Sequence, residues 1–382
     1  MEAFSFSIPQ NITVGKGSLS LLGEIAKKMS GKKAFIISGP HLEKMGMVEK
    51  CTRMLQDACI DTATFSDTEG NPGTDTVSKA TKAFIESGAD FIVAMGGGSP
   101  LDVAKAVAVL AKYGGNIVEY EGGGKVPGPV IPMIAIPTTA GTGSEVTAFS
   151  VITDHERQYK LTVVSNYLLP AYAILDSELI SSVPERTAAA CGVDAMVHAL
   201  EAYLSLGATP VSDMFALKAL ELIGKNIRGY VANRSSSEAS EGMLLGSLLA
   251  GIAFSQARLG NVHAMSHPVS AIFDVPHGVA NAILLPTVVE YNALADNGKY
   301  YDIYRCVAKC PVKKEEFTQE LLVTELKKLN AELGIPARLR DVKVTEDFFY
   351  KMSDDAMKSC NILVNPRSTT KRDIIRLYQN AF

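Results

Sequence analysis

Short apolar runs that alternate with helical patterns dominate the first half of the chain and restrict its fold more than any other feature. Five runs of four to six residues are typical of strands, at residues 33–38, 62–65, 90–95, 132–137 and 171–175. Between them, residues 41–59 and 74–87 have helical spacing, and a further helix follows the third run. Buried strands separated by helices indicate a parallel sheet that is covered on both faces. The first half is therefore predicted to be α/β.

The second half has a different pattern. Four segments carry apolar residues at three- and four-residue spacing, at residues 186–206, 210–232, 237–254 and 316–333. No convincing strand follows residue 175. The length of 382 residues suits two domains of roughly 150–200 residues each. We expect an α/β domain over residues 1–180 and an all-helical domain over residues 181–382.

Charge and composition exclude several classes of function. Lys and Arg number 37 against 41 Asp and Glu, without a basic block, so a nucleic-acid groove is not expected. No apolar stretch approaches the roughly 18–20 residues of a membrane helix, and the first residues do not resemble a signal peptide. The six cysteines are scattered and form no CxxC pair, which is typical of reduced thiols. We expect a cytoplasmic protein that binds neither nucleic acid nor membrane.

A glycine-rich loop follows the third predicted strand and leads into a helix. It consists of Gly96, Gly97, Gly98 and Ser99. Glycines let backbone N–H groups approach an anion, and a helix N-terminus adds a favourable dipole, so the loop suits a phosphate. We expect Ser99 to cap the helix, Asp102 to complete a capping box and Lys105 to add positive charge. A well-capped helix after a tight turn is the alternative interpretation.

A second polar loop, at residues 137–145, follows the fourth predicted strand. Small hydroxyl residues at the carboxyl end of a parallel strand can meet a ligand at a topological switch point. We expect this loop to line the same crevice as the glycines. The chain has neither the G-x-G-x-x-G fingerprint nor the G-K-[ST] ending of a P-loop. The two loops favour the pyrophosphate of a dinucleotide on a Rossmann-like domain over kinase-type chemistry.

Histidines gather in the helical half, which holds four of the six in the chain. Asp194 and His198 are four residues apart on one predicted helix, so their side chains leave the same face. His263 and His267 repeat this spacing, and His277 follows ten residues later. Imidazoles and a carboxylate form a ligand set for a divalent metal such as Fe, Zn or Ni. The alternative is that each histidine is separately a core or surface residue.

Four motifs occur along the chain in the order that one protein family has, and together they resemble that family. They are GGGSPLDVAK, PTTAGTGSEVT, GVDAMVHALEAYLS and GNVHAMSHPVSAIFDVPHGVANAILLP. The chain resembles the iron-dependent (group III) alcohol dehydrogenases along essentially all of its length. This resemblance implies an α/β dinucleotide-binding domain followed by an all-α metal-binding and catalytic domain, an architecture shared with dehydroquinate synthases.

The resemblance also implies roles for individual residues. The ligands of Fe²⁺, or of Zn²⁺, would be Asp194, His198, His263 and His277. His267 would lie close to the nicotinamide and the substrate, with a role in proton relay. The pyrophosphate would be cradled by Gly96, Gly97, Gly98 and Ser99, with Asp102 supporting the loop. The cofactor would be lined by Thr138, Thr139, Thr142 and Thr147, and Lys160 would reach the ribose.

One departure from the family pattern concerns the choice of cofactor. Many members have an Asp after the first strand of the α/β domain, where it holds the ribose 2′-OH and repels a 2′-phosphate. Gly39 stands at that position here. The cofactor is therefore expected to be NAD or NADP, without the discrimination that a carboxylate provides.

The resemblance implies a metal-dependent alcohol dehydrogenase, or aldehyde reductase, that transfers a hydride between NAD(P)(H) and a short-chain alcohol or aldehyde. The family forms dimers and larger assemblies, so a homodimer or larger homo-oligomer is expected. One alternative is a dehydroquinate synthase-like cyclase, which predicts a phosphate-bearing sugar acid as substrate and extra basic residues in the helical half. Another is a binding module with a decayed site, which requires a missing ligand or a broken glycine loop, and the sequence has neither.

Overall fold

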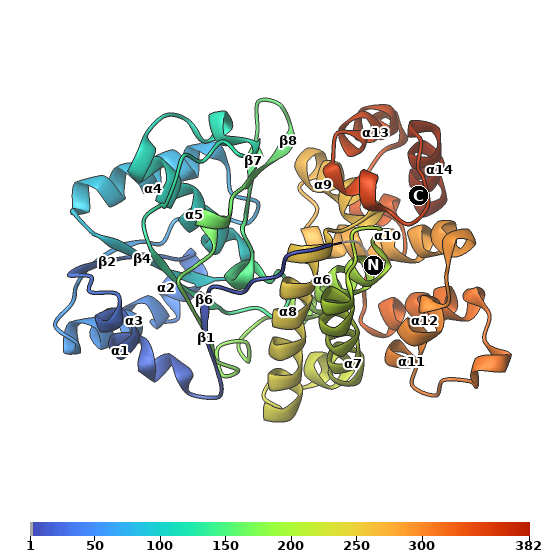
Figure 1. Cartoon of the computed structure of the whole chain (residues 1–382), viewed down its shortest axis with the longest axis horizontal. Helices are drawn as coiled ribbons and strands as arrows, with labels where there is room; N and C mark the ends of the chain where they lie inside the picture. Colours follow the sequence, from blue (N-terminus) through green and yellow to red (C-terminus); the bar gives the residue numbers. More distant parts are fainter. Residues whose placement is uncertain (1–2) are drawn as a thin grey trace. The chain divides into compact units, whose positions relative to one another are not determined.

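The computed structural model describes residues 3–382, which divide into two compact units (Figure 1). The first, called the α/β unit below, comprises Ser7–Thr139 and Ser144–Ile180. The second, called the helical unit, comprises Ser181–Phe382 together with Ala140–Gly143 and residues 3–6. A single boundary after residue 180 therefore does not account for two short segments of the first half.

Six parallel strands form the sheet of the α/β unit, in the order β1-β9-β6-β4-β2-β3. Their bounds are β1 Asn11–Val14, β2 Lys33–Ile37, β3 Asp61–Phe65, β4 Phe91–Gly96, β6 Met133–Pro137 and β9 Tyr172–Leu175. Five of the six are the strands expected from the apolar runs, so the parallel α/β fold is confirmed. The exception is β1, an edge strand in which no residue is fully buried.

Helices cover both faces of this sheet. On one face, α1 (Leu22–Lys28) and α3 (Met47–Asp57) contribute Leu22 and Leu55 to a buried cluster with Ile36 of β2. On the other face lie α4 (Thr74–Ser87) and α5 (Gly98–Tyr113). There the rings of Phe84 and Phe35 meet edge to face, with centroids 5.5 Å apart. The continuous apolar runs of the central strands are explained by burial from both sides.

The single helix expected over residues 41–59 is wrong, because the structure has two helices there. The first, α2, spans Pro40–Lys44, and α3 begins at Met47. Between them Gly46 adopts a left-handed conformation with φ of +72°. Glycine enters this region readily because it has no Cβ, and a single residue in it interrupts a right-handed helix.

A smaller sheet completes the α/β unit. Its strands are β5 (Gly122–Gly123), β7 (Phe149–Asp154) and β8 (Tyr159–Val164), in the order β5-β8-β7. β7 and β8 run antiparallel and form a hairpin. This hairpin matters for the site because α5 packs against β7.

In the described part of the chain after residue 181, the structure has helices and no strand. The helices are α6 Glu185–Leu204, α7 Pro210–Ala232, α8 Ser237–Ala257, α9 Asn261–Phe273, α10 His277–Asn292, α11 Lys299–Val307, α12 Gln319–Glu332, α13 Phe349–Met357 and α14 Lys371–Ala381. The four predicted helices correspond to α6, α7, α8 and α12. α6 packs against α7, α8 and α10 and is buried along most of its length. Polar side chains on α6 therefore need partners inside the protein.

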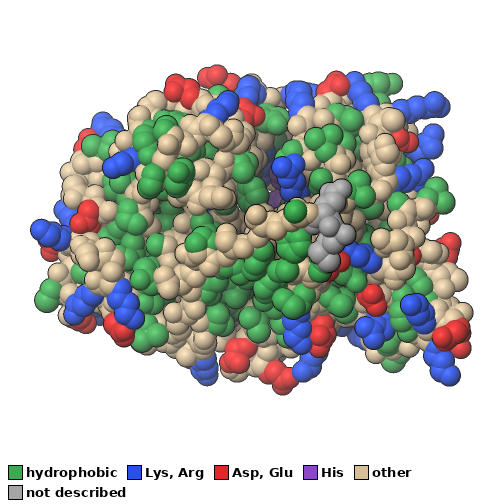
Figure 2. All heavy atoms as spheres, viewed as in Figure 1, with side chains coloured by type: hydrophobic (Ala, Val, Ile, Leu, Met, Phe, Trp, Pro, Cys, Tyr) green, Lys and Arg blue, Asp and Glu red, His purple; other side chains and the backbone are tan. Residues whose placement is uncertain are grey.

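No single helix of residues 3–382 is long and apolar enough to cross a membrane. α8 and α9 pass that test only as a pair, and the chain bends by 105° between them. On the face drawn in Figure 2, Lys and Arg side chains are interspersed with Asp and Glu, and the described residues form no broad basic area there.

Candidate metal centre and dinucleotide loop

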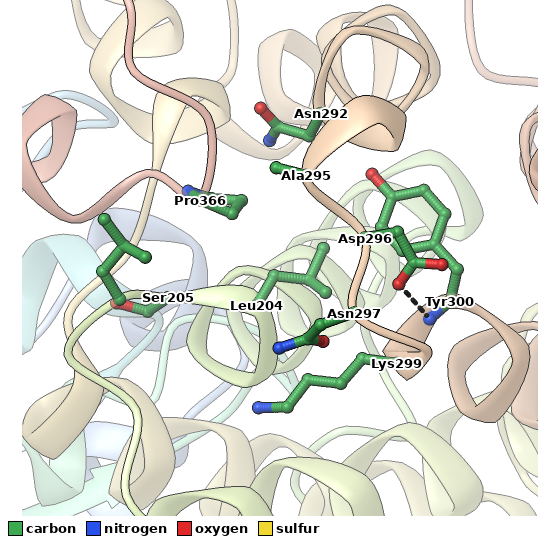
Figure 3. A pocket seen from close by; sticks show the side chains of 10 residues that line it. Leu204, Ser205, Asn292, Ala295, Asp296, Asn297, Lys299, Tyr300 and Pro366 are labelled. Atoms are coloured by element: carbon green, nitrogen blue, oxygen red, sulfur yellow. Dashed lines mark hydrogen bonds between the residues drawn. The ribbon is translucent and has the colours of Figure 1, made fainter.

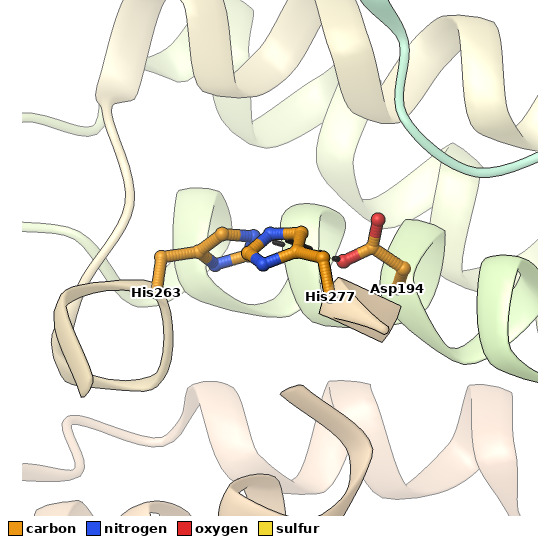
Figure 4. Close-up of side chains that lie close together, drawn as sticks. All are labelled: Asp194, His263 and His277. Atoms are coloured by element: carbon orange, nitrogen blue, oxygen red, sulfur yellow. Dashed lines mark ion pairs between the residues drawn. The ribbon is translucent and has the colours of Figure 1, made fainter. Parts of the chain in front are cut away.

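Three side chains with metal-binding atoms converge from three helices of the helical unit (Figure 4). Asp194 lies in the middle of α6, His263 in the first turn of α9, and His277 is the first residue of α10. Their ligand atoms all lie within 4.8 Å of one another. Asp194 Oδ1 is 3.8 Å from Nε2 of His263 and 3.9 Å from Nε2 of His277. One carboxylate oxygen and two imidazole nitrogens gathered in this way suit Fe²⁺ or Zn²⁺.

His198, the fourth expected ligand, lies beside this group. Its ring stacks on that of His263, with centroids 4.5 Å apart and planes at 23°, and on the ring of Phe254 at the same distance. Its Nδ1 is 3.2 Å from the carbonyl oxygen of Gly141. A ring that donates from Nδ1 to a carbonyl has its lone pair on Nε2, which is the arrangement of a metal-binding histidine. Within the described residues, however, the group of mutually close ligand atoms contains the other three residues and not His198.

Glu201 is a residue that the sequence analysis missed. It lies on α6, buried, with Oε2 2.6 Å from Nδ1 of His263 and Oε1 accepting the N–H of Val262 at 2.7 Å. A carboxylate behind a metal-binding imidazole fixes the ring and its tautomer, so that Nε2 faces the ion. The signal was present in the sequence, because Asp194, His198 and Glu201 fall on one face of an otherwise apolar helix. A glutamate in such a helix requires a buried partner.

Burial determines the protonation of His263 and Glu201. The pKa of His263 lies well below its ordinary value chiefly because burial disfavours the charged form of its ring, and the neighbouring His198 lowers it further. His263 is therefore a neutral imidazole near pH 7, the form that binds metals. Burial raises the pKa of Glu201 to about 7, although N–H groups of Val262, Gly260 and His263 favour its carboxylate form.

His267 lies one turn after His263 on α9. Its ring centroid is 6.3 Å from that of His263, at an interplanar angle of 89°, and 5.3 Å from that of His277. It is only half-buried, whereas His263 is buried. The structure therefore places His267 next to the ligand group, on its more exposed side.

The two polar loops begin side by side in the α/β unit, because the strands that precede them, β4 and β6, are neighbours in the sheet. Gly96, the last residue of β4, pairs with Pro137, the last residue of β6. The N–H of Thr138 donates to the carbonyl oxygen of Gly96 at 2.9 Å. A Cβ built on Gly97 would come within 3.3 Å of Thr139 Oγ1, so the glycine keeps the backbone accessible beside the second loop.

The capping prediction for α5 is wrong in its details. The helix begins at Gly98, and its N-cap is Gly97 rather than Ser99. Among the described residues no side chain caps this end, and its first turn contains no acidic residue. The N–H groups of the first turn of this 16-residue helix are thus not satisfied by a side-chain cap, which is the arrangement that binds a phosphate. The donors and the glycine backbone fit a dinucleotide pyrophosphate.

Lys105 and Asp102 form a buried network instead of facing the loop. Lys105 is fully buried, and its ammonium donates to Ser144 Oγ at 2.9 Å, Thr147 Oγ1 at 3.2 Å and the Phe149 carbonyl at 2.8 Å. The carboxylate of Asp102 accepts from Ser144 Oγ at 2.6 Å and lies 4.0 Å from the ammonium. This network ties α5 to the segment before β7. The expectation that Lys105 adds charge at a phosphate is therefore wrong.

The other residues expected at the cofactor are spread over several elements. Gly39 is the N-cap of α2, directly after β2, and Lys160 in β8 donates to Asn71 Oδ1 at 2.7 Å. Thr138, Thr139 and Thr147 belong to the α/β unit, whereas Thr142 belongs to the segment Ala140–Gly143 of the helical unit.

A small pocket of about 90 Å³ lies between the end of α6 and the start of α11 (Figure 3). Its walls include Ser205, Asp296, Lys299 and Tyr300. Asp296 accepts the N–H of Tyr300 at 3.1 Å, and Lys299 pairs with Asp213 at 2.8 Å. Ligand pockets usually measure roughly 300 Å³ or more, and the charged groups here already have partners. We assign this pocket no ligand.

Comparison with known proteins identifies the family. Residues 9–177 match the family model described as iron-containing alcohol dehydrogenase, and residues 188–382 match the C-terminal model of the Fe-containing alcohol dehydrogenase family. A 1,3-propanediol dehydrogenase of Citrobacter freundii is 38% identical over 382 residues, covering 99% of each chain. The lactaldehyde reductase of Escherichia coli (strain K12) is 37% identical over 371 residues, covering 96% of this chain and 97% of the relative.

A solved structure supports the same family assignment. The crystal structure of a 1,3-propanediol oxidoreductase superposes with a TM-score of 0.95 at 37% identity, and all of both chains is covered. None of these relatives is a cyclase, so the dehydroquinate synthase-like alternative is not favoured. The chain therefore belongs to the iron-containing alcohol dehydrogenase family, whose members are oxidoreductases that use Fe²⁺ and NAD(P).

Proposed function

We propose that this chain interconverts a short-chain alcohol and the corresponding aldehyde by hydride transfer to or from NAD(P)(H), with a divalent metal at the substrate oxygen. The observation that carries the proposal is the convergence of Asp194, His263 and His277, with Glu201 behind His263. Relatives named as propanediol dehydrogenase and lactaldehyde reductase support a short, hydroxylated substrate.

The residues of the chain have three tasks in this reaction. Asp194, His198, His263 and His277 hold the ion, and the loop Gly96–Ser99 binds the pyrophosphate through backbone N–H groups. The cofactor is further lined by Thr138, Thr139, Thr142 and Thr147, with Lys160 at the ribose. When bound, the ion supplies Lewis acidity at the substrate oxygen, and the nicotinamide supplies or accepts the hydride.

The proposed function is tested by an anaerobic assay of the Fe²⁺-reconstituted protein with NADH and NADPH against a panel of short aldehydes. We expect turnover that a chelator abolishes and that added Fe²⁺ restores. Turnover that survives complete removal of metal, or a metal-loaded protein that reduces no aldehyde, would contradict the proposal.

His267 is proposed to move the hydroxyl proton between substrate and solvent. Its ring lies 5.3 Å from that of His277 and is half-buried, so it can exchange protons with water. We expect His267→Ala to lower kcat by about 10²-fold and to remove one ionisation from the pH profile. His155→Ala, which changes an exposed histidine, is the control. An unchanged rate and pH profile in His267→Ala would remove this role.

Gly39 is proposed to permit NADPH. Because a carboxylate at this position would repel a 2′-phosphate, we expect Gly39→Asp to lower kcat/KM with NADPH about tenfold relative to NADH. A Cβ at Gly39 would lie 3.1 Å from the Thr68 carbonyl oxygen, so part of any loss has a steric origin. Gly39→Asn has the same size without the charge and measures that part. An equal loss with both cofactors in Gly39→Asp would show that Gly39 does not determine cofactor choice.

Assembly and location also belong to this proposal. The chain is proposed to act in the cytoplasm as a homodimer or larger homo-oligomer. Several large apolar side chains near the N-terminus support a protein contact, because they are exposed: Phe4, Phe6, Ile8 and Val14. Light scattering of the purified protein is expected to give at least twice the chain mass of 40.8 kDa, and a single-chain mass would contradict this.

A further inference from the structure

Asn281 makes close contacts with all three converging ligand residues. It lies on α10, one turn after His277, and its side chain is completely buried. Its amide nitrogen Nδ2 is 2.5 Å from Asp194 Oδ1 and 3.1 Å from Nε2 of both His263 and His277. The amide is thus directed at the atoms that would hold the ion.

Those three atoms need either a donor or a cation among them. Each presents a lone pair, and Asp194 Oδ1 is 3.8 and 3.9 Å from the two imidazole nitrogens. Buried acceptors without a partner are unfavourable, because they lose their hydrogen bonds to water without gaining new ones. A side-chain amide supplies two N–H donors, so Asn281 satisfies up to two of the three acceptors at one time.

The oxygen of the same amide is not satisfied in this way. Asn281 Oδ1 is buried and accepts no hydrogen bond from the described residues. A half-turn of the amide would exchange its nitrogen and its oxygen, and would bring an acceptor against the three acceptors. The ligand atoms, rather than any partner of Oδ1, therefore determine the orientation of the side chain.

We propose that Asn281 is a positioning residue that occupies the ligand atoms of the metal centre until a cation takes them. The inference rests on the metal centre of the proposed function and concerns how that centre is loaded. Donation to an imidazole Nε2 favours the tautomer with its proton on Nδ1, which is the form that binds a metal through Nε2. These hydrogen bonds must be given up when the ion binds. They therefore stabilise the metal-depleted chain and weaken its net affinity for the ion.

The test is a thermodynamic cycle on the full-length chain with Asn281→Leu, which retains the side-chain size and removes both polar groups. Wild type and variant are depleted with a chelator and reloaded with Zn²⁺, and Tm is measured for both forms. We expect Tm of the depleted variant to fall by several degrees and Tm of the loaded variant to fall much less. In a competition titration, the variant is expected to bind Zn²⁺ about tenfold more tightly than the wild type.

Asn330→Leu is the matched control. Asn330 is a buried asparagine of α12 whose amide donates at 2.6 Å to the carbonyl oxygen of Ala282, next to Asn281 in sequence. Losing that hydrogen bond is expected to lower Tm of the depleted and the loaded forms equally. If Asn281→Leu does not accumulate as folded protein, Asn281→Ala enters the same cycle.

Two results would overturn the inference. Equal losses of Tm in the depleted and loaded forms of the Asn281 variant would mean that Asn281 only packs the core. A larger loss in the loaded form would mean that Asn281 supports the bound ion instead of competing with it. A wild-type chain whose Tm does not respond to Zn²⁺ is a separate outcome, because it would overturn the metal centre and the proposed function together.

Discussion

Replacing His263 by alanine is expected to abolish tight metal binding and to lower kcat/KM by about 10³-fold or more. His263 belongs to the group of three close ligand residues, and its ring has its Nε2 atom 3.8 Å from Asp194 Oδ1. A Lewis acid at the substrate oxygen is worth several kcal/mol, and about 1.4 kcal/mol corresponds to a factor of ten in rate. Metal content per chain and aldehyde reduction, measured on the same preparation, test the expectation.

The control for this prediction is His41→Ala, which removes an exposed histidine at the start of α2. It is expected to retain the wild-type metal content and rate. Circular dichroism establishes whether each variant is folded, because removal of His263 leaves Glu201 buried without its imidazole partner. A folded His263→Ala protein that still holds one tightly bound ion per chain would refute the ligand assignment.

The second large effect is expected from Glu201→Gln. The carboxylate of Glu201 accepts from Nδ1 of His263 at 2.6 Å and from the N–H of Val262 at 2.7 Å. Glutamine has one acceptor oxygen and one donor group, so it cannot accept both hydrogen bonds through separate oxygens. His263 would lose the partner that fixes its tautomer, and metal affinity is expected to weaken by about 10–100-fold.

Glu238→Gln serves as the control for Glu201→Gln. Glu238 lies in the first turn of α8 with 80% of its side chain exposed, and it pairs with Lys225 on the surface. We expect no change in metal affinity, because exposed ion pairs contribute little to stability. The partner of Glu238 is Lys225, which is not a ligand residue. Equal affinities for the Glu201 and Glu238 variants would remove the role given to Glu201.

The fold could be predicted where the local pattern of apolar residues indicates burial. The runs that became β2, β4 and β6 are apolar because helices cover the sheet on both sides. β1 was not predicted, and exposure alone does not explain why, because β3 is also an edge strand without a buried residue and was found. The break at Gly46 was missed because a glycine within an amphipathic pattern is compatible with either a continuous or an interrupted helix.

The candidate site was only partly accessible from the sequence. Spacing on a helix predicted that Asp194 and His198 share a face, and the structure brings Asp194 together with His263 and His277. Spacing does not reveal which neighbouring element covers a side chain. Lys105 was therefore misjudged, because the residues that bury its ammonium come from a segment about 40 positions later in the chain.

Glu201 and Asn281 were missed for a related reason. Each acts on a ligand residue supplied by another helix, and no local pattern connects Glu201 to His263 or Asn281 to Asp194. The physical signal was a carboxylate and an amide inside apolar helices, which identifies a residue in need of a partner but not the partner itself.

We propose that side chains of the helical unit hold one divalent ion. The most direct measurement is a crystal structure of the Fe²⁺-loaded protein, with anomalous scattering recorded on both sides of the iron edge. The account predicts one strong iron peak bound by Asp194, His263 and His277, with His198 as the fourth protein ligand. A peak bound by other residues, or a fully loaded crystal without a peak between these side chains, would contradict it.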